Sequence, residues 1–197
     1  MTAPDIGQQY DEIASWWNER HDHSTYGLAQ VNRALAFVPN GGKALDVGCG
    51  SGGRFVRRLI EQRFIVTGID ASAQMIGLAR ANHPDTLFIN ANIIDWKTSE
   101  TYDFILVWDC LFHLPLEHQA QVLSKLCGLL SKNGVLIHSF GDGDGDHTDR
   151  WRGQTFRYSS MGITRNIEVL HDRGLSLLHL ELDQFPENHV YAISRKL

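Results

Sequence analysis

The sequence predicts an α/β domain with a mostly parallel sheet, helices on both faces of that sheet and one antiparallel strand at the C-terminal end. Short apolar runs alternate along the chain with segments in which apolar residues recur at helical spacing. The runs Lys43–Gly48 and Phe64–Asp70 flank one such segment, an arrangement typical of parallel strands joined by crossover helices. The last two apolar runs, 175–183 and 189–196, are joined by five residues, too few for a crossover helix. We therefore expect these two strands to be antiparallel.

The central part of the chain, residues 43–140, carries the predicted parallel strands. Helices are predicted over 54–63, over the segment that contains Met75 and Ala79, and over Glu117–Leu130, because apolar residues recur there every three or four positions. The strands are expected, in chain order, at Lys43–Gly48, Phe64–Asp70, Thr86–Asn90, Tyr102–Trp108 and Val135–Phe140.

The two ends of the chain are expected to cover the sheet and its ligand site. Residues 1–42 are predicted to form a helical cap of one or two helices. Residues 141–197 are predicted to supply a mobile acidic loop at 142–147 on the substrate side, a helix at Thr164–Asp172 and the two antiparallel strands. No repeat or low-complexity linker divides the chain, so the sequence predicts one domain over 1–197.

The composition excludes several classes of function. Of 197 residues, 43% are hydrophobic and 21% are charged, and the net charge is −5. No run of Lys or Arg suggests a nucleic-acid partner, and no apolar run approaches the roughly 18 residues that span a membrane. Cys49, Cys110 and Cys127 have neither disulfide nor metal-ligand spacing, so no metal is expected. The polar N-terminus is unlike a signal peptide, and we expect a cytoplasmic protein of undetermined oligomeric state.

The densest motif is the glycine-rich stretch "ALDVGCGSGG" at 44–53. Its glycines satisfy the GxGxxG pattern of dinucleotide-binding loops, and Asp70 ends the next predicted strand, where a ribose-binding acid belongs. The spacing alone would fit a nicotinamide cofactor. However, Asp46 lies two residues before the first glycine, where its carboxylate would repel a pyrophosphate. A cofactor with a sulfonium and an ammonium group would accept that acid.

The stretch "LDVGCGSGG" resembles the first motif of the class I S-adenosylmethionine-dependent methyltransferases, an acid followed by closely spaced glycines. The resemblance continues in order through "VTGIDAS", "NANIIDW", "YDFILVWDCLFHL" and "LLSKNGVLIHSF", over about half of the chain. It implies a Rossmann-like, seven-stranded sheet whose last strand is antiparallel, and S-adenosylmethionine as methyl donor with S-adenosylhomocysteine as its product. Two other interpretations stay open: a non-catalytic module that binds S-adenosylmethionine, and an NAD-dependent oxidoreductase.

The resemblance also implies a donor site. Asp70 would accept hydrogen bonds from both ribose hydroxyls, and Asp46 would anchor the glycine loop and the ammonium group of the donor. Asn92 stands where the family most often has an acid that faces the adenine, and its carbonyl oxygen can accept the same hydrogen bond. The implied donor-binding residues are Asp46, Gly48, Cys49, Gly50, Gly52, Asp70, Ala71, Met75, Asn92, Ile93 and Trp108.

The acceptor side carries titratable and aromatic residues but no diagnostic spacing. Methyl transfer depends mainly on positioning, and a general base can assist when the acceptor is a hydroxyl or an amine. No NPPY-like tetrapeptide and no Pro-Cys pair follows the fourth strand, which disfavours nucleic-acid bases and favours an O or N of a small molecule. A helix-capping role for His113 and a packing role for Trp17 stay open. The candidate catalytic residues are His113, His138, His147 and Tyr158, and the candidate substrate-binding residues are Tyr10, Trp17 and Trp151.

Overall fold

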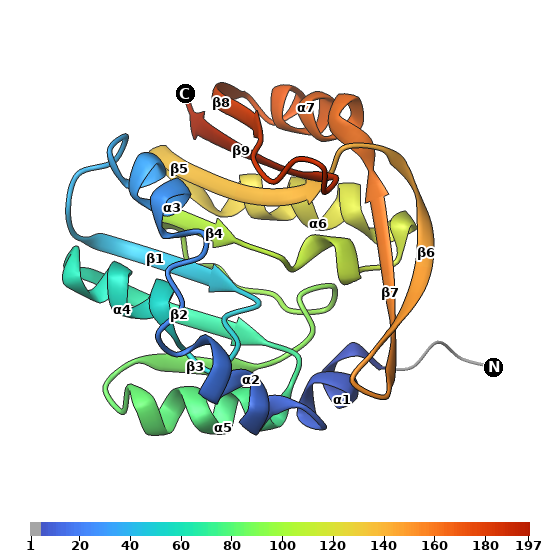
Figure 1. Ribbon diagram of the computed structural model, residues 1–197. Coiled ribbons are helices and arrows are strands. Elements are labelled where there is room, and N and C mark those ends of the chain that lie inside the picture. Colours follow the sequence, from blue (N-terminus) through green and yellow to red (C-terminus); the bar gives the residue numbers. More distant parts are fainter. Residues whose placement is uncertain (1–4) are drawn as a thin grey trace.

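A seven-stranded sheet forms the centre of the protein in the computed structural model, which describes residues 5–197 (Figure 1). All neighbouring strands are parallel except at β9, which is antiparallel to both β5 and β8. The predicted fold class, including the antiparallel C-terminal strand, is confirmed. The spatial order is β3 (Leu87–Asn90), β2 (Phe64–Asp70), β1 (Gly42–Val47), β4 (Tyr102–Val107), β5 (Leu130–Gly141), β9 (His189–Lys196) and β8 (Leu175–Leu182).

Helices pack on both faces of this sheet because its strands are apolar on both sides. Side chains of α3 (Leu28–Leu35), α4 (Arg54–Glu61) and α5 (Ala73–Asn82) share one buried cluster with alternate strand residues. The opposite face packs against α6 (Leu116–Leu129) and α7 (Gly162–Asp172) in a second cluster. This double burial is why the parallel strands read as nearly continuous apolar runs.

A β-hairpin stands where the sequence predicted a mobile acidic loop. Strands β6 (Asp144–Trp151) and β7 (Gln154–Met161) form a separate two-stranded antiparallel sheet, so the loop assignment at 142–147 is wrong for most of its length. The side chains of β6 are exposed almost throughout, and only β7 buries residues against the body of the protein. An outer strand without a buried face carries no apolar alternation, so no sequence pattern predicts it.

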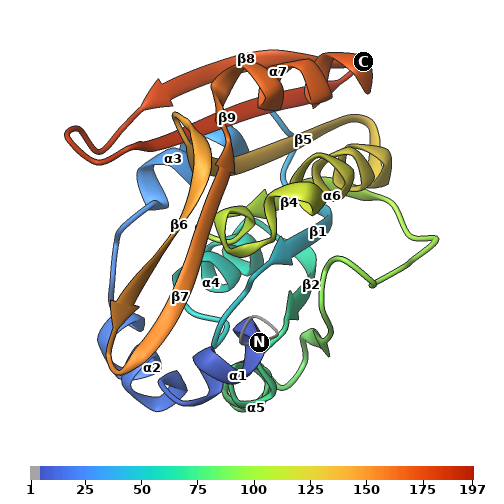
Figure 2. The same ribbon diagram turned by 90° about the vertical axis from the view of Figure 1, so that its right-hand side faces the viewer.

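The hairpin crosses the edge of the sheet at which the parallel strands end (Figures 1 and 2). It runs from the region of α7 to the two N-terminal helices, α1 (Ile6–Asp11) and α2 (Ala14–His21). Gln119 of α6 holds β7 in place: its Nε2 donates to the carbonyl of Ser159 at 2.8 Å, and its Oε1 accepts from the amide of Met161 at 3.2 Å. The hairpin therefore covers the carboxyl edge of the sheet.

Helix α1 is fixed beside this edge by its contacts with the start of α5. The Oδ1 of Asp11 accepts from the hydroxyl of Ser72 at 2.5 Å and from the amide of Gln74 at 2.9 Å. A Cβ at Gly7 would lie 2.5 Å from the carbonyl oxygen of Ala71, so this close approach requires glycine. The cap predicted as one or two helices over 1–42 contains three helices in the part that the structure describes, and two of them, α1 and α2, lie over the ends of the strands.

Candidate active site

The glycine loop between β1 and α4 is held against the end of β2 by backbone hydrogen bonds. The amides of Gly48 and Cys49 both donate to the carbonyl of Ile69, at 2.8 and 3.1 Å. Gly48 is left-handed, with φ +74°, and a Cβ there would lie 2.9 Å from the Cβ of Cys110. A side chain is therefore excluded on two grounds, and the loop backbone is free to face the cavity described below.

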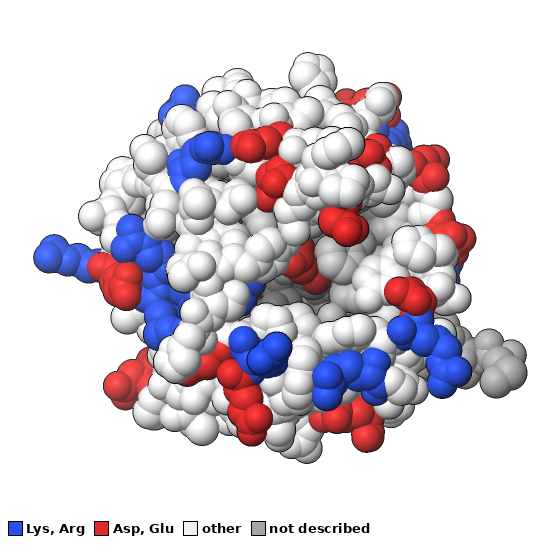
Figure 3. Space-filling model, in the orientation of Figure 1, with Lys and Arg blue, Asp and Glu red and all other residues white. Residues whose placement is uncertain are grey.

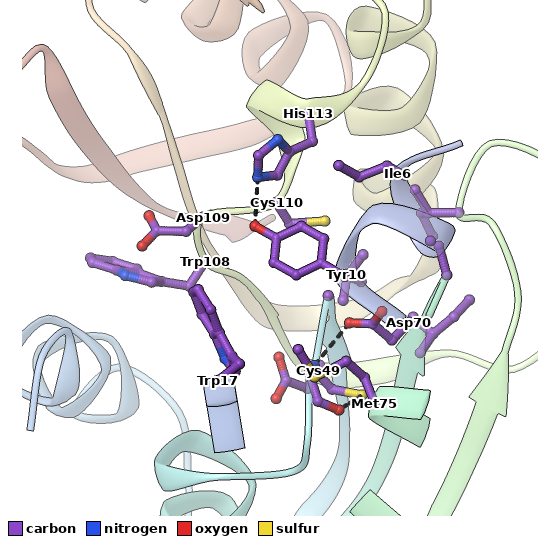
Figure 4. A pocket seen from close by; sticks show the side chains of 18 of the residues that line it. Ile6, Tyr10, Trp17, Cys49, Asp70, Met75, Trp108, Asp109, Cys110 and His113 are labelled. Atoms are coloured by element: carbon purple, nitrogen blue, oxygen red, sulfur yellow. Dashed lines mark hydrogen bonds between the residues drawn. The ribbon is translucent and has the colours of Figure 1, made fainter. Parts of the chain in front are cut away.

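Asp70 ends β2 beside this loop, and two amides fix its carboxylate. Its Oδ2 accepts from the amide of Gly50 at 2.9 Å, and its Oδ1 accepts from the amide of Ser72 at 2.9 Å (Figure 4). Burial raises the pKa of Asp70, while these hydrogen bonds oppose the rise. Each carboxylate oxygen can accept more than one hydrogen bond, so Asp70 can hold the loop and still receive hydroxyl groups from a ligand.

Asp46 is a buried acid in β1, with 3% of its surface exposed. Burial, and then the negative charge of Asp70, raise the pKa of Asp46 to about 7. The side chain borders the cavity. A cation bound there would favour the ionised carboxylate, so Asp46 and Asp70 together mark this end of the cavity for a ligand with positive charge.

One cavity of about 370 Å³ extends from the glycine loop to the space beneath the β6–β7 hairpin (Figure 4). Gly52 lies outside it: the Gly52 carbonyl accepts from Nε2 of His83 at 2.6 Å, and its Cα faces α5. Gly52 therefore shapes the loop without bordering the cavity. The other sequence-implied donor residues all line it: Asp46, Gly48, Cys49, Gly50, Asp70, Ala71, Met75, Asn92, Ile93 and Trp108.

Aromatic residues from the N-terminal helices and the hairpin also line the cavity. Tyr10 from α1, Trp17 from α2, and Trp151 and Tyr158 from the hairpin all line it. The ring of Trp17 lies edge-on to that of Tyr10, with centroids 5.7 Å apart, and edge-on to that of Trp151, with centroids 6.0 Å apart. The structure thus brings together the three predicted substrate-binding residues and the predicted catalytic residue Tyr158.

Tyr10 and His113 form a hydrogen-bonded pair inside the cavity (Figure 4). The Nδ1 of His113 lies 3.2 Å from the carbonyl of Arg157, which can only accept, so Nδ1 carries the proton. The Nε2 is then an acceptor and receives the hydroxyl of Tyr10 at 2.9 Å. Burial lowers the pKa of His113 to about 4 and raises that of Tyr10, so both groups are neutral at pH 7.

The structure does not place the other two candidate histidines in this cavity. His138 is fully buried in β5, where its ring stacks on Phe140 and its Nε2 lies 3.2 Å from Oδ1 of Asn166. Burial lowers its pKa to about 4. His147 lies on exposed strand β6 with its ring stacked on Tyr158, and it borders a neighbouring groove instead. We therefore correct both assignments: His138 is a core residue, and His147 lies on the outer strand of the β6–β7 hairpin.

Several polar or aromatic residues line the cavity without having been identified from the sequence, among them Arg54, Asp109, Phe112 and Asp149. Two of them carried a usable signal. Arg54 directly follows the glycine loop as the first residue of α4, and Asp109 follows Trp108 at the carboxyl end of β4. Ligands of such sheets bind at this edge, so both positions could have been proposed. Phe112 and Asp149 reach the cavity through tertiary packing that no local pattern predicts.

The mouth of the cavity carries charges of both signs. Figure 3 shows a hollow on the face seen in Figure 1, with acidic side chains in and above it and basic side chains below it.

A metal site is not found among residues 5–197, where no group of three or more His, Cys, Asp or Glu side chains could hold a metal ion. No helix in the same range has the length and hydropathy that crossing a membrane requires.

Comparison with known proteins places this fold and cavity in a family. Residues 17–180 match the model of a methyltransferase domain. The trans-aconitate 2-methyltransferase of Escherichia coli O1:K1 is 38% identical over 100 residues, which are 49% of this chain and 38% of that protein. A second such enzyme, from Escherichia coli O17:K52:H18, is 37% identical over 113 residues, which are 55% of this chain and 43% of that protein. The matched region thus spans less than half the length of these relatives.

Solved structures show the same fold over nearly the whole chain. The complex of DhpI with SAH superposes with a TM-score of 0.74 at 21% identity, covering 96% of this chain and 94% of that one. The N-methyltransferase NodS of Bradyrhizobium japonicum, in complex with S-adenosylhomocysteine, gives a TM-score of 0.71 at 17% identity, covering 98% and 99%.

The α/β fold and its strand-edge cavity are therefore those of a Rossmann-like methyltransferase. The chain belongs to the methyltransferase-domain family, and the resemblance to the class I S-adenosylmethionine-dependent methyltransferases is confirmed.

Proposed function

We propose that this chain binds S-adenosylmethionine and transfers its methyl group to an O or N of a small-molecule acceptor held beneath the β6–β7 hairpin. One observation carries the proposal: a single cavity joins the glycine loop and two strand-end acids to an aromatic chamber that contains the Tyr10–His113 pair. The family and the names of the curated relatives support a small-molecule acceptor.

The cavity residues fit the chemistry of the donor. Asp70 offers two carboxylate oxygens to a ribose diol, and Asp46 offers a buried negative charge to the ammonium group. Arg54 borders the cavity with a guanidinium that makes no salt bridge to the described residues, and it suits the donor carboxylate. Ala71 and Ile93 supply apolar surface for the adenine. S-adenosylmethionine, when bound, supplies a methyl group that is electrophilic because it is attached to a positively charged sulfur.

Tyr10, His113 and the aromatic residues beside them would position the acceptor and receive its proton. The neutral Nε2 of His113 already accepts the hydroxyl of Tyr10, so an acceptor that donates to the Tyr10 oxygen would complete a relay to the imidazole. Tyr10 would pass its own proton to Nε2 as it receives one. The surrounding rings of Trp17 and Trp151 exclude water from this end, which strengthens polar interactions there.

A label-transfer assay tests the proposal. The purified protein is incubated with methyl-labelled S-adenosylmethionine and a metabolite extract, and label is sought in extract components. We expect transfer to a small molecule, lowered by about 10²-fold in Tyr10→Phe and in His113→Gln, the usual contribution of general acid–base groups. Binding of S-adenosylhomocysteine to both variants, measured calorimetrically, should stay near that of the wild type.

The exposed His171 provides the matched control, and His171→Gln should transfer label like the wild type. Donor binding without any transfer to the extract would instead support a non-catalytic binding module. Calorimetric binding of NAD in preference to S-adenosylmethionine would reject the proposal.

A further inference from the structure

Negative side chains outnumber positive ones in the cavity lining, even when the charges of a bound donor are counted. Within residues 5–197 the lining carries four carboxylates, those of Asp46, Asp70, Asp109 and Asp149, and a single guanidinium, that of Arg54. The donor has one carboxylate, which suits Arg54, although the charge of Arg54 also interacts with Asp109. Asp46, in β1 just before the glycine loop, suits the ammonium and sulfonium groups of the donor. Asp109 and Asp149 are left for the acceptor. An anionic acceptor would meet their negative charges, whereas a cation would be attracted to both.

Asp109 borders the cavity, and hydrogen bonds fix its position. It follows β4 in a left-handed conformation, with φ +51°, and its amide donates to the hydroxyl oxygen of Ser139 at 2.7 Å. The Ser139 hydroxyl in turn donates to Oδ1 of Asp109 at 3.1 Å. The Nε2 of His189 donates to the same Oδ1 at 2.9 Å. Tyr26 also contacts this carboxylate through its hydroxyl. Each carboxylate oxygen has two lone pairs, so Asp109 can still accept a donor from the cavity.

His189 donates to this carboxylate without cancelling the local negative charge. Its Nδ1 lies 2.5 Å from Oδ1 of Asp183, so both ring nitrogens donate to carboxylates and the ring is an imidazolium. Burial opposes that charge, but the hydrogen bonds to Asp109 and Asp183 outweigh it and raise the pKa of His189. Two carboxylates then share one imidazolium, and the group retains one net negative charge at the wall of the cavity.

The cavity that Asp109 borders is also lined by aromatic rings, those of Tyr10, Trp17, Phe112, Trp151 and Tyr158. The faces of such rings attract organic cations, and the attraction is stronger where water is excluded. A cavity that combines an acid with several aromatic rings is a site for an ammonium group carried on a carbon skeleton.

We propose that the acceptor is an organic amine that binds in protonated form, with its ammonium group donating to Asp109 and its carbon skeleton against the aromatic rings. The inference rests on the function proposed above and names its substrate class. The ammonium nitrogen has to lose one proton before it can react, since its lone pair is otherwise occupied. That proton passes to the Tyr10 oxygen as the Tyr10 hydroxyl gives its own proton to Nε2 of His113, while Asp109 holds another N–H of the ammonium group.

Four small molecules that differ in charge serve as probes to test the inference on the wild-type protein. Protein saturated with S-adenosylhomocysteine is titrated calorimetrically with phenethylamine, phenethyl alcohol, phenylpropionate and trans-aconitate. Phenethylamine should bind at least about tenfold more tightly than the alcohol, the scale of a hydrogen bond to a charged group, and the two anions should bind more weakly still. An alcohol or anion that binds as tightly as the amine would overturn the inference.

Asp109→Asn should remove the preference for the amine and leave S-adenosylhomocysteine affinity within about twofold. The exposed Asp172 supplies the matched control, and Asp172→Asn should keep the preference. If Asp109→Asn does not fold, the four probes on the wild type still decide. S-adenosylhomocysteine binding is measured first: its absence contradicts the proposed function, whereas its presence without amine preference contradicts this inference alone.

Discussion

The two ends of the cavity are built in different ways. The end proposed to bind the donor (the donor end) is formed by loops that directly follow β1 and β2, and backbone amides hold its key side chains, as with Asp70 and Gly50. The end proposed to bind the acceptor (the acceptor end) is assembled from segments far apart in the chain: Tyr10 bonds His113, 103 positions away, and Gln9 donates to the carbonyl of Thr155, 146 positions away. The donor end therefore depends on the sheet itself, and the acceptor end depends on the docking of α1 and the hairpin.

The largest effect is expected at the donor end from Gly48→Ala. A left-handed backbone costs a residue with a side chain roughly 1–2 kcal/mol, and the clash with Cys110 adds a similar amount, so the free energy of unfolding should fall by about 2–4 kcal/mol. Denaturant unfolding measures it. Gly77→Ala, in helix α5 with open space around its Cβ, is the control and should be neutral or slightly stabilising. Equal effects would show that the loop tolerates side chains.

Acidification should lower the free energy of unfolding through His113 at the acceptor end. The pKa of His113 is about 4 in the folded protein and near 6.5 when unfolded, so the unfolded chain binds more protons between these values. Stability should therefore fall as pH drops from 6.5 towards 4, by roughly 2–3 kcal/mol from this residue. The buried His138 adds a similar loss.

Unfolding of wild type and His113→Gln at pH 7 and pH 4.5 isolates the first contribution. The variant should lose less stability on acidification than the wild type, and His171→Gln should behave like the wild type. Identical pH dependence in all three proteins would show that His113 is not held neutral by burial.

A smaller effect is expected on donor affinity from Asp70→Ala. Loss of hydrogen bonds to a charged acceptor should weaken S-adenosylhomocysteine binding by about 1.5–3 kcal/mol, measured by calorimetry. Because Asp70 also holds Gly50, circular dichroism must show that the variant is folded. Unchanged affinity in a folded variant would refute the ribose assignment.

The same contrast explains what the sequence could predict. The sheet, its antiparallel strand and nearly all of the donor end follow from local signals, because apolar runs, glycines and the acids beside them lie close together in the chain. His113 and Tyr158 could be proposed one by one, but their meeting with Tyr10 depends on how α1 and β7 pack. His138 was misassigned because lying at the end of a strand does not reveal which way a side chain points. Strand β6 gave no signal because it buries almost nothing.

The tryptophans lie where their fluorescence can report on occupation of the cavity. Trp17, Trp108 and Trp151 line the cavity, and the ring centroid of Trp16 lies 5.2 Å from that of Trp151. Four of the five tryptophans in the chain therefore lie at or beside the ligand site, and only Trp96 is elsewhere. Indole emission responds to local polarity and to nearby charge. Occupation of the cavity can thus be followed by intrinsic fluorescence, and single replacements of Trp17 and Trp151 show which of these rings carries the signal.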